Sequence, residues 1–300
     1  MLRVANLAQH TFFLNNVLNL QSRTFEQQAQ IATGKKALNY SGIARDAKRL
    51  ITLEGSKSQT AQFVENNQRV IARAERMDAA VSGIFDAASE LRTTLIQRLN
   101  DAGGDVVNLS LIAQNLLDSV GSLLNSDEDG RFLFSGSMTD TPPVQFPVPD
   151  PASFGVLDNN YYQGDNIQLT VRADVNLTVT YGMGADRIGF QRIIGALKAA
   201  VEGHATNDKG LIESALSLVN TAIADLADYR NELGNTLLTL DDTNSRHRDF
   251  VVYLDNQISN IEDVDITEAI IRLTENQTIL EASFLTVSRL SNLNLSDFLR

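Results

Sequence analysis

Hydrophobic positions near the end of the chain recur at alternating steps of four and three residues. Within residues 264–299 this spacing places one apolar stripe along an α-helix, where it can pack on a partner helix. The stripe consists of Ile266, Ile270, Leu273, Gln277, Leu280, Phe284 and Val287. A terminal helix with such a stripe is predicted to bury it on another helix.

The first thirty residues show the same spacing and form the nearest match to the C-terminal stripe. This second stripe consists of Val4, Leu7, Thr11, Leu14, Leu18, Gln21, Phe25 and Gln28. Both ends need other helices to cover them, which indicates a subunit that completes its folding during assembly. The candidate assembly interface is therefore the C-terminal stripe together with Val4, Leu7, Leu14, Leu18 and Phe25.

Two very long helices are predicted between the chain ends. Residues 43–100 contain no proline, and their stripe is Val70, Ala74, Met77, Val81, Ile84, Ala88, Leu91 and Leu95. Residues 211–261 carry a stripe from Ile212 through Leu226 and Leu240 to Ile261, with His247 on it. At 1.5 Å per residue the first helix would be roughly 80 to 90 Å long, which is typical of a rod.

The middle of the chain has a different pattern. A helix is expected over residues 106–123, a turn at 101–105, a short strand at 131–137 and another helix at 190–201. All five prolines fall within residues 142–151, and segments of alternating polarity follow at 161–171 and 175–181. This pattern predicts an irregular loop and a small β-rich insertion.

The fold class predicted is mainly α, with an elongated antiparallel helical bundle or coiled-coil rod formed by both chain ends. Residues 1–42 and 262–300 are expected to form a terminal coiled-coil domain, and 43–138 with 188–261 a long-helix rod domain. Residues 139–187 are expected to form the β-rich insertion. The chain would run out along the rod and back.

Composition narrows the possible functions of these 300 residues. The net charge of −12 argues against binding to nucleic acid or to an anionic membrane. Residues 1–42 carry four basic and one acidic side chain, while 262–300 carry three basic and seven acidic ones. These opposite charges favour antiparallel pairing of the ends. The N-terminus shows no signal-peptide pattern, so we expect a protein that is either cytoplasmic or exported by a route without a cleaved signal peptide.

No motif assembles a catalytic, cofactor or metal site. Residues 125–132 partly match a calcium loop, but Gly136 stands where the bidentate glutamate belongs, so an acidic turn is preferred. Residues 181–186 contain GMG without the rest of a nucleotide-binding fingerprint and are interpreted as a turn. His247 has no nucleophile or second base at helical spacing, so we expect a packed or solvated residue. A non-enzymatic protein without cofactor is predicted.

Polar residues interrupt both terminal stripes, at Gln21, Gln28 and Gln277. Such residues can fix the register between neighbouring subunits, because a polar residue in a coiled coil gives up stability to specify pairing. They can equally face water in a wet seam. We slightly favour the role in register.

The chain resembles the bacterial flagellin family of flagellar axial proteins, over nearly its whole length except the β-rich insertion. The N-terminal half carries this resemblance in QIATGKKALNYSG (residues 30–42), RLITLE (49–54) and NQRVIARAERMDAA (67–80). The C-terminal match covers residues 261–299, where acidic residues, EAI, NQT and LEASF follow in a fixed order. Residues 131–144 and 161–165 resemble the distal hook–filament junction members more than the filament flagellins.

This resemblance implies a function and partners. Such proteins are exported unfolded through the flagellar type III apparatus, with a chaperone, and work outside the cell. Their terminal helices are largely disordered in the monomer and form the inner coiled-coil tube of the flagellum. A junction member forms a homo-oligomeric ring between the proximal hook-associated protein and flagellin. After Asn39 the chain departs from the family, with YSGIARDA in place of a Ser-Asp-Asp-Pro type loop.

Two other functions stay open at this point. A short flagellin forming the filament itself would have the same fold. A carbohydrate-binding or adhesive surface protein would instead use the β-rich insertion, with Phe154, Tyr161 and Tyr162 as stacking platforms.

Overall fold

The structure is a computed structural model that describes residues 2–100, 108–146, 157 and 159–292, with side chains described from residue 11 to residue 289 within these ranges. The chain divides into two compact units. One consists of residues 1–59 and 251–300, and the other of residues 60–250. The turn expected at 101–105, Val106 and Phe154 lie outside the described residues.

The unit of residues 60–250 is built on four helices that share one hydrophobic core. They are most of α2 (Ala47–Asn100), α3 (Leu109–Leu124), α4 (Ile188–Ala205) and most of α5 (Lys209–Glu262). All eight predicted stripe positions of α2 from Val70 to Leu95 are buried, which confirms that stripe. On α5, Ile212, Leu226 and Leu240 are buried as predicted. The 3-4 spacing thus identified the core face of both long helices.

Helix α5 is also long and apolar enough to cross a membrane by length and composition. A core helix of a soluble protein passes the same test. The stripe of α5 contributes to the shared core through positions such as Ala215, Val219 and Ala222. The composition of α5 is therefore weak evidence for a membrane span.

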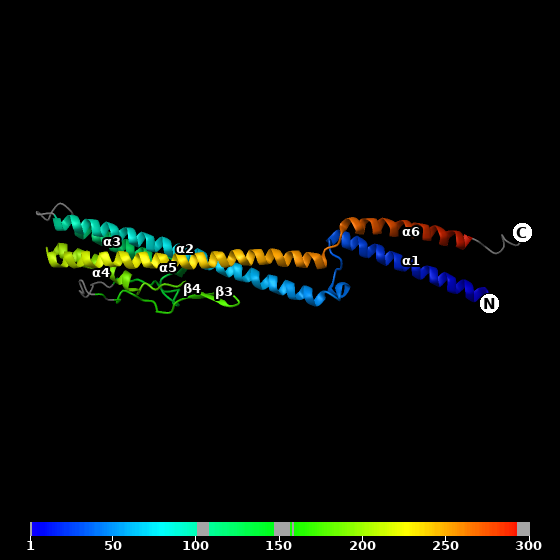
Figure 1. The fold of residues 1–300 in the computed structure, drawn as a ribbon, viewed down its shortest axis with the longest axis horizontal. Coiled ribbons are helices and arrows are strands. Elements are labelled where there is room, and N and C mark those ends of the chain that lie inside the picture. The colour runs from blue at the N-terminus through cyan, green and yellow to red at the C-terminus, as the bar shows by residue number, and fades with distance from the viewer. Residues whose placement is uncertain (1, 101–107, 147–156, 158, 293–300) are drawn as a thin grey trace. The chain divides into compact units, whose positions relative to one another are not determined.

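The named strands of the described residues form two short antiparallel hairpins. Strand β1 (Asp127–Glu128) pairs with β2 (Arg131–Phe132). Strand β3 (Thr170–Asp174) pairs with β4 (Leu177–Thr180) (Figure 1). The first hairpin turns at Asp129 and Gly130, with φ angles of 53° and 74°. Two positive φ values in a two-residue turn are those of a type I′ hairpin, which Asp-Gly favours.

The strand predicted for residues 131–137 is wrong beyond Phe132. Leu133 and Phe134 are buried in the helical core instead, and the Phe134 ring lies edge-on to Phe190 with centroids 5.9 Å apart. A segment whose apolar side chains are buried between helices does not need to pair with a neighbouring strand. Its aromatic and apolar composition therefore led to the wrong prediction.

The unit of residues 1–59 and 251–300 contains helix α1 (Leu2–Thr33), a 3-10 turn η1 (Tyr40–Ile43), the beginning of α2, the end of α5 and helix α6 (Ile266–Asn292). Helices α1 and α6 lie side by side and antiparallel, as the charges predicted (Figure 1). Helix α2 begins at Ala47 and not at residue 43, because residues 40–43 form η1 and the Asn39 side chain accepts a hydrogen bond from the Gly42 N–H.

A buried polar cluster lies beside the second hairpin in the unit of residues 60–250. The Asn67 amide donates to the Ala173 carbonyl and to Asn244 Oδ1, each at 3.0 Å. His247 Nε2 lies 3.0 Å from the same carbonyl, and its ring stacks on Phe63. His247 is therefore a packed helix residue that helps to anchor β3.

We predict that Asn67→Ala lowers the free energy of unfolding by about 1 to 3 kcal/mol, because Asn244 and the Ala173 carbonyl lose a buried hydrogen-bond partner. The matched control is Asn66→Ala, since the neighbouring Asn66 is exposed. Urea unfolding followed by circular dichroism measures both variants. Equal stabilities of the two variants would show that the cluster contributes nothing.

Candidate assembly interface

Helices α1 and α6 of the same chain pack on each other along one line of heptad-spaced contacts, which we call the seam. Val17 and Thr24 of α1 and Ala269 of α6 are buried, at 8%, 9% and 3% exposure. The other seam positions are half-buried and continue the 3-4 spacing: Phe13, Leu20, Gln27 and Ile31 on α1, and Leu273, Asn276, Leu280, Ser283 and Val287 on α6. One polar pair lies in the seam, where Asn276 Nδ2 donates to Gln27 Oε1 at 2.9 Å.

The predicted N-terminal stripe is not this seam. Leu14 and Leu18 are each 54% exposed and Phe25 is 68% exposed, so the stripe lies on the outward face of α1. Its positions follow the seam positions by one residue, which is a rotation of about 100° around the helix. Val4 and Leu7 belong to the same stripe, but their side chains lie outside the described residues.

The predicted C-terminal stripe divides between two faces of α6. Leu273, Leu280 and Val287 are half-buried in the seam. Ile266, Ile270 and Phe284 are 50%, 47% and 48% exposed, and Gln277 is exposed with them. The expectation that the two chain ends bury these stripes on each other holds for three α6 positions only, because a pair of helices shares one narrow contact line.

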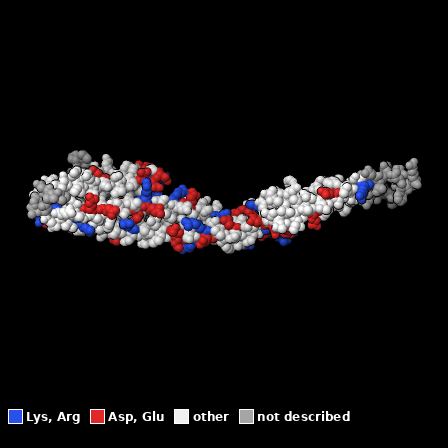
Figure 2. Space-filling model, turned by 90° about the horizontal axis from the view of Figure 1, so that it is seen from above, with Lys and Arg blue, Asp and Glu red and all other residues white. Residues whose placement is uncertain are grey.

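The outward faces of both helices carry large apolar side chains. Among the described residues, those at least 43% exposed are Phe12, Leu14, Leu18 and Phe25 of α1, and Ile266, Ile270, Ile271, Ile279, Phe284 and Leu285 of α6. Charged side chains are sparse on the face of this helix pair shown in Figure 2. Soluble proteins rarely leave such large apolar surfaces uncovered, so these faces are candidates for contact with other subunits.

The polar stripe residues share the outward face of the pair. Gln21, Gln28 and Gln277 are all exposed in the single chain. They lie among Leu14, Leu18 and Phe25 on α1 and beside Phe284 on α6. A role in fixing the register between subunits stays a prediction.

The base of the helix pair is held by the two connections that follow α1 and α5. Helix α1 ends at Gly34, whose φ of 72° is a left-handed helix cap and whose N–H donates to the Gln30 carbonyl at 2.8 Å. Asp265 caps α6, since its carboxylate accepts from the N–H groups of Thr267 and Glu268 at 2.9 and 3.1 Å. Both helices of the pair therefore have defined ends at the base.

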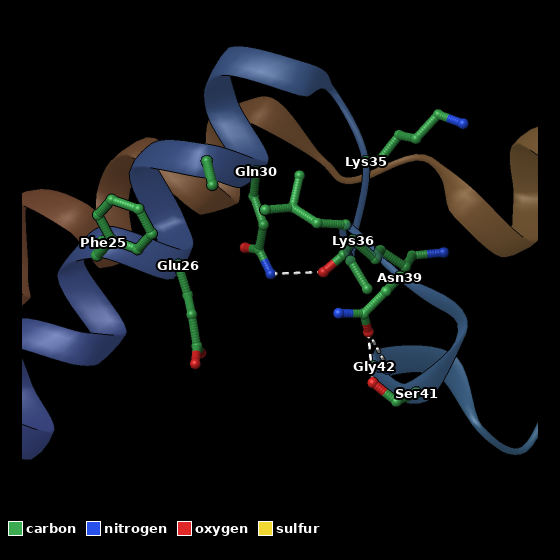
Figure 3. A pocket seen from close by; sticks show the side chains of 11 residues that line it. Phe25, Glu26, Gln30, Lys35, Lys36, Asn39, Ser41 and Gly42 are labelled. Atoms are coloured by element: carbon green, nitrogen blue, oxygen red, sulfur yellow. Dashed lines mark hydrogen bonds between the residues drawn. The ribbon is translucent and has the colours of Figure 1, made fainter.

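An open pocket of about 490 Å³ lies between α1 and the loop that follows it. Its apolar wall includes Phe25 and Leu38, each 68% exposed, and its polar rim includes Gln30 and Asn39 (Figure 3). Phe25 continues the outward face of α1 into this pocket.

The other segments that the sequence suggested as possible binding sites have structural roles. The calcium-like segment is the tight turn of the first hairpin, and the described residues contain no group of acidic or histidine side chains arranged for a metal. Residues 181–187 form the loop between β4 and α4. Tyr161 is 1% exposed and donates to the Ala185 carbonyl at 2.8 Å, so its interpretation as a stacking platform is wrong.

Tyr162 is half-buried and is likewise committed to the fold. Its hydroxyl donates to the Asp165 carbonyl at 2.5 Å, and burial raises its pKa. The Asp165 carboxylate accepts hydrogen bonds from the Ser137 hydroxyl and N–H, which lower the pKa of Asp165. These contacts join residues 135–137 to 161–165, so neither Tyr161 nor Tyr162 is a free aromatic platform for the adhesive interpretation.

Four outward residues were missed by the sequence pattern: Phe12, Ile271, Ile279 and Leu285. Ile271 and Leu285 each follow a stripe position by one residue. A wider apolar face, and not a single stripe, was the signal that would have identified them.

Comparison with known proteins places these helices in context. Residues 216–299 match the model of the bacterial flagellin C-terminal helical region. The chain is 22% identical to flagellar hook-associated protein 3 of Escherichia coli over 312 residues, covering 94% of this chain and 95% of that protein. It is also 22% identical to flagellar hook-associated protein 3 of Salmonella typhimurium, covering 98% of each chain.

A solved structure shares the fold. A Vibrio parahaemolyticus protein described as flagellar hook-associated superposes with a TM-score of 0.64 at 19% identity, covering 74% of this chain and 100% of the other. Residues 216–299 therefore match the bacterial flagellin C-terminal helical region, in a chain that is similar to flagellar hook-associated protein 3 over nearly its whole length.

Proposed function

We propose that the protein is a structural subunit of the bacterial flagellum, an adaptor at the hook–filament junction that assembles through α1 and α6. The observation that carries this proposal is the exposed apolar outward face of the α1–α6 pair. Full-length similarity to hook-associated protein 3 supports the junction as its position. No assembled catalytic constellation competes with a structural role among the described residues.

The energetics favour assembly over isolated folding of the terminal helices. Complete burial of a leucine-sized side chain contributes about 1.5 to 3 kcal/mol. Leu14, Leu18, Phe25 and Phe284 are each about half exposed or more in the single chain. Neighbouring subunits would supply the missing contacts, and these contacts would offset the entropy lost when the helices become ordered.

The proposal also assigns partners. Copies of this chain would form a ring, with the proximal hook-associated protein on one side and flagellin on the other. The flagellar export apparatus and an export chaperone would deliver the chain to the outside of the cell. The resemblance of residues 30–42 and 261–299 to flagellar axial proteins supports these assignments.

We predict that Phe284→Glu abolishes assembly at the hook while the chain still folds. The side chain is 48% exposed in the single chain, so the folded chain tolerates a charge there. A buried, unpaired carboxylate in the proposed interface would be strongly unfavourable. Motility and filament attachment are measured in a strain that lacks its own copy of this protein, together with circular dichroism of the purified variant.

The control for this variant is Thr221→Glu, which adds the same charge at an exposed polar position of α5, outside the α1–α6 pair. It is expected to restore motility. If Phe284→Glu supported filaments as well as the parent chain, the outward face of α6 would not be an assembly surface.

We predict that immunogold labelling of isolated flagella gives a single band at the hook end. A junction adaptor is confined to a ring, whereas a filament subunit would be stained along the whole filament. The two patterns exclude each other. Staining along the filament would replace the junction proposal with that of a short flagellin.

A further inference from the structure

The seam between α1 and α6 is weak for a pair of this length. Only Val17, Thr24 and Ala269 are buried among its described side chains, and one of these is polar while another is an alanine. The remaining positions are half-buried and include Gln27 and Asn276. The seam alone therefore fixes the alignment of the two helices only weakly, and contacts at the ends of the helices can add to it.

Two backbone hydrogen bonds join the connections at the base of the pair. The Lys36 N–H donates to the Glu262 carbonyl at 2.6 Å, and the Val264 N–H donates to the Gly34 carbonyl at 2.9 Å. Lys35 and Asp263 form an isolated antiparallel bridge between them. We call residues 34–36 and 262–264 the connection bridge.

The Lys36 side chain joins this bridge to the end of α5. Its Nζ donates to the carbonyls of Asn260 and Ile261 at 2.8 and 3.1 Å. These carbonyls belong to the last turn of α5, where no N–H donor of the same helix follows, and a cation there is favoured by the helix dipole. Lys36 thus caps the C-terminal end of α5, although it lies 224 positions before Asn260 in the sequence.

The same residue is bound to α1. The Gln30 side-chain amide donates to the Lys36 carbonyl at 2.8 Å, as the dashed line in Figure 3 shows. The adjacent Lys35 pairs with Glu262 at 2.9 Å, and this hydrogen bond raises the pKa of Lys35. Lys36 is therefore in contact with both α1 and α5, one residue from an ion pair that spans the same two connections.

We propose that Lys36 is a positioning residue, which stabilises the connection bridge and so favours one register whenever α1 and α6 of a single chain pair. The bridge fixes the two helix bases next to each other, and pairing of the rest of the seam then becomes a local event with a high effective concentration. The inference rests on the proposed function in one respect, because the pair that Lys36 aligns is the proposed assembly element.

The test is a disulfide cross-link across the seam of the full-length chain. The natural chain contains no cysteine, so Gln27→Cys and Asn276→Cys introduce a single possible pair at two side chains in direct contact. The rate of cross-linking under a fixed oxidant reports how often the seam is closed in register. Lys36→Met in this background keeps the aliphatic stem but removes the donors.

We expect Lys36→Met to slow the cross-link by roughly three- to tenfold, the factor that corresponds to the loss of an exposed hydrogen bond from a charged group. Lys36→Arg restores donors and is expected to recover most of the rate. The matched control is Lys57→Met, which removes a Lys–Asp pair with Asp255 in the same unit and is expected to leave the rate unchanged.

Two results would overturn the inference. One is a Lys36→Met chain that cross-links at the parent rate, and the other is an equal slowing by Lys57→Met, which would indicate general loosening. Failure of the proposed function is seen separately. A Phe284→Glu chain that assembles normally would refute the assembly surface without changing any of these cross-linking rates.

Discussion

A pair of helices can bury only one face of each partner, and this limit governs the terminal part of the chain. The α1–α6 seam takes up positions such as Val17 and Leu280 and leaves Leu14, Phe25 and Phe284 in water. In the unit of residues 60–250, four helices share a core and the corresponding stripes are covered. The unit of residues 60–250 therefore buries its apolar stripes within one chain, because each helix has several neighbouring helices. The α1–α6 pair does not, because each helix has only one.

The sequence predicted the long helices well because their stripes admit one interpretation. On α2 the residues that follow the stripe positions include polar ones such as Glu75, Asp78 and Arg92, so they form no second continuous apolar stripe. On α1 two heptad repeats one residue apart are both rich in apolar residues. Periodicity cannot state which of them meets α6 and which faces outward, and the prediction chose the outward one.

The remaining differences come from long-range contacts. The apolar run at residues 131–137 satisfies a strand pattern, but Phe134 finds a place beside Phe190, which is 56 positions away in the sequence. Tyr161 could be an exposed platform or a core residue on composition alone, and its hydroxyl bond to Ala185 decides for the core. The contacts of Lys36 with Asn260 and Ile261 carried no sequence signal, since a lysine in a glycine-containing loop predicts only exposure.

A bias of α1 and α6 toward one register changes how assembly would proceed. The family resemblance implies terminal helices that are largely disordered in the monomer, and a marginal seam is compatible with that, because half-buried contacts contribute little. The connection bridge adds a bias toward one register within this exchange between paired and separated helices. A neighbouring subunit that binds the paired form then bears less of the ordering entropy, and its binding shifts the population toward closed pairs. The weak seam keeps the two helices available for contact with other subunits. The connection bridge favours the register in which their apolar faces are aligned when those subunits bind.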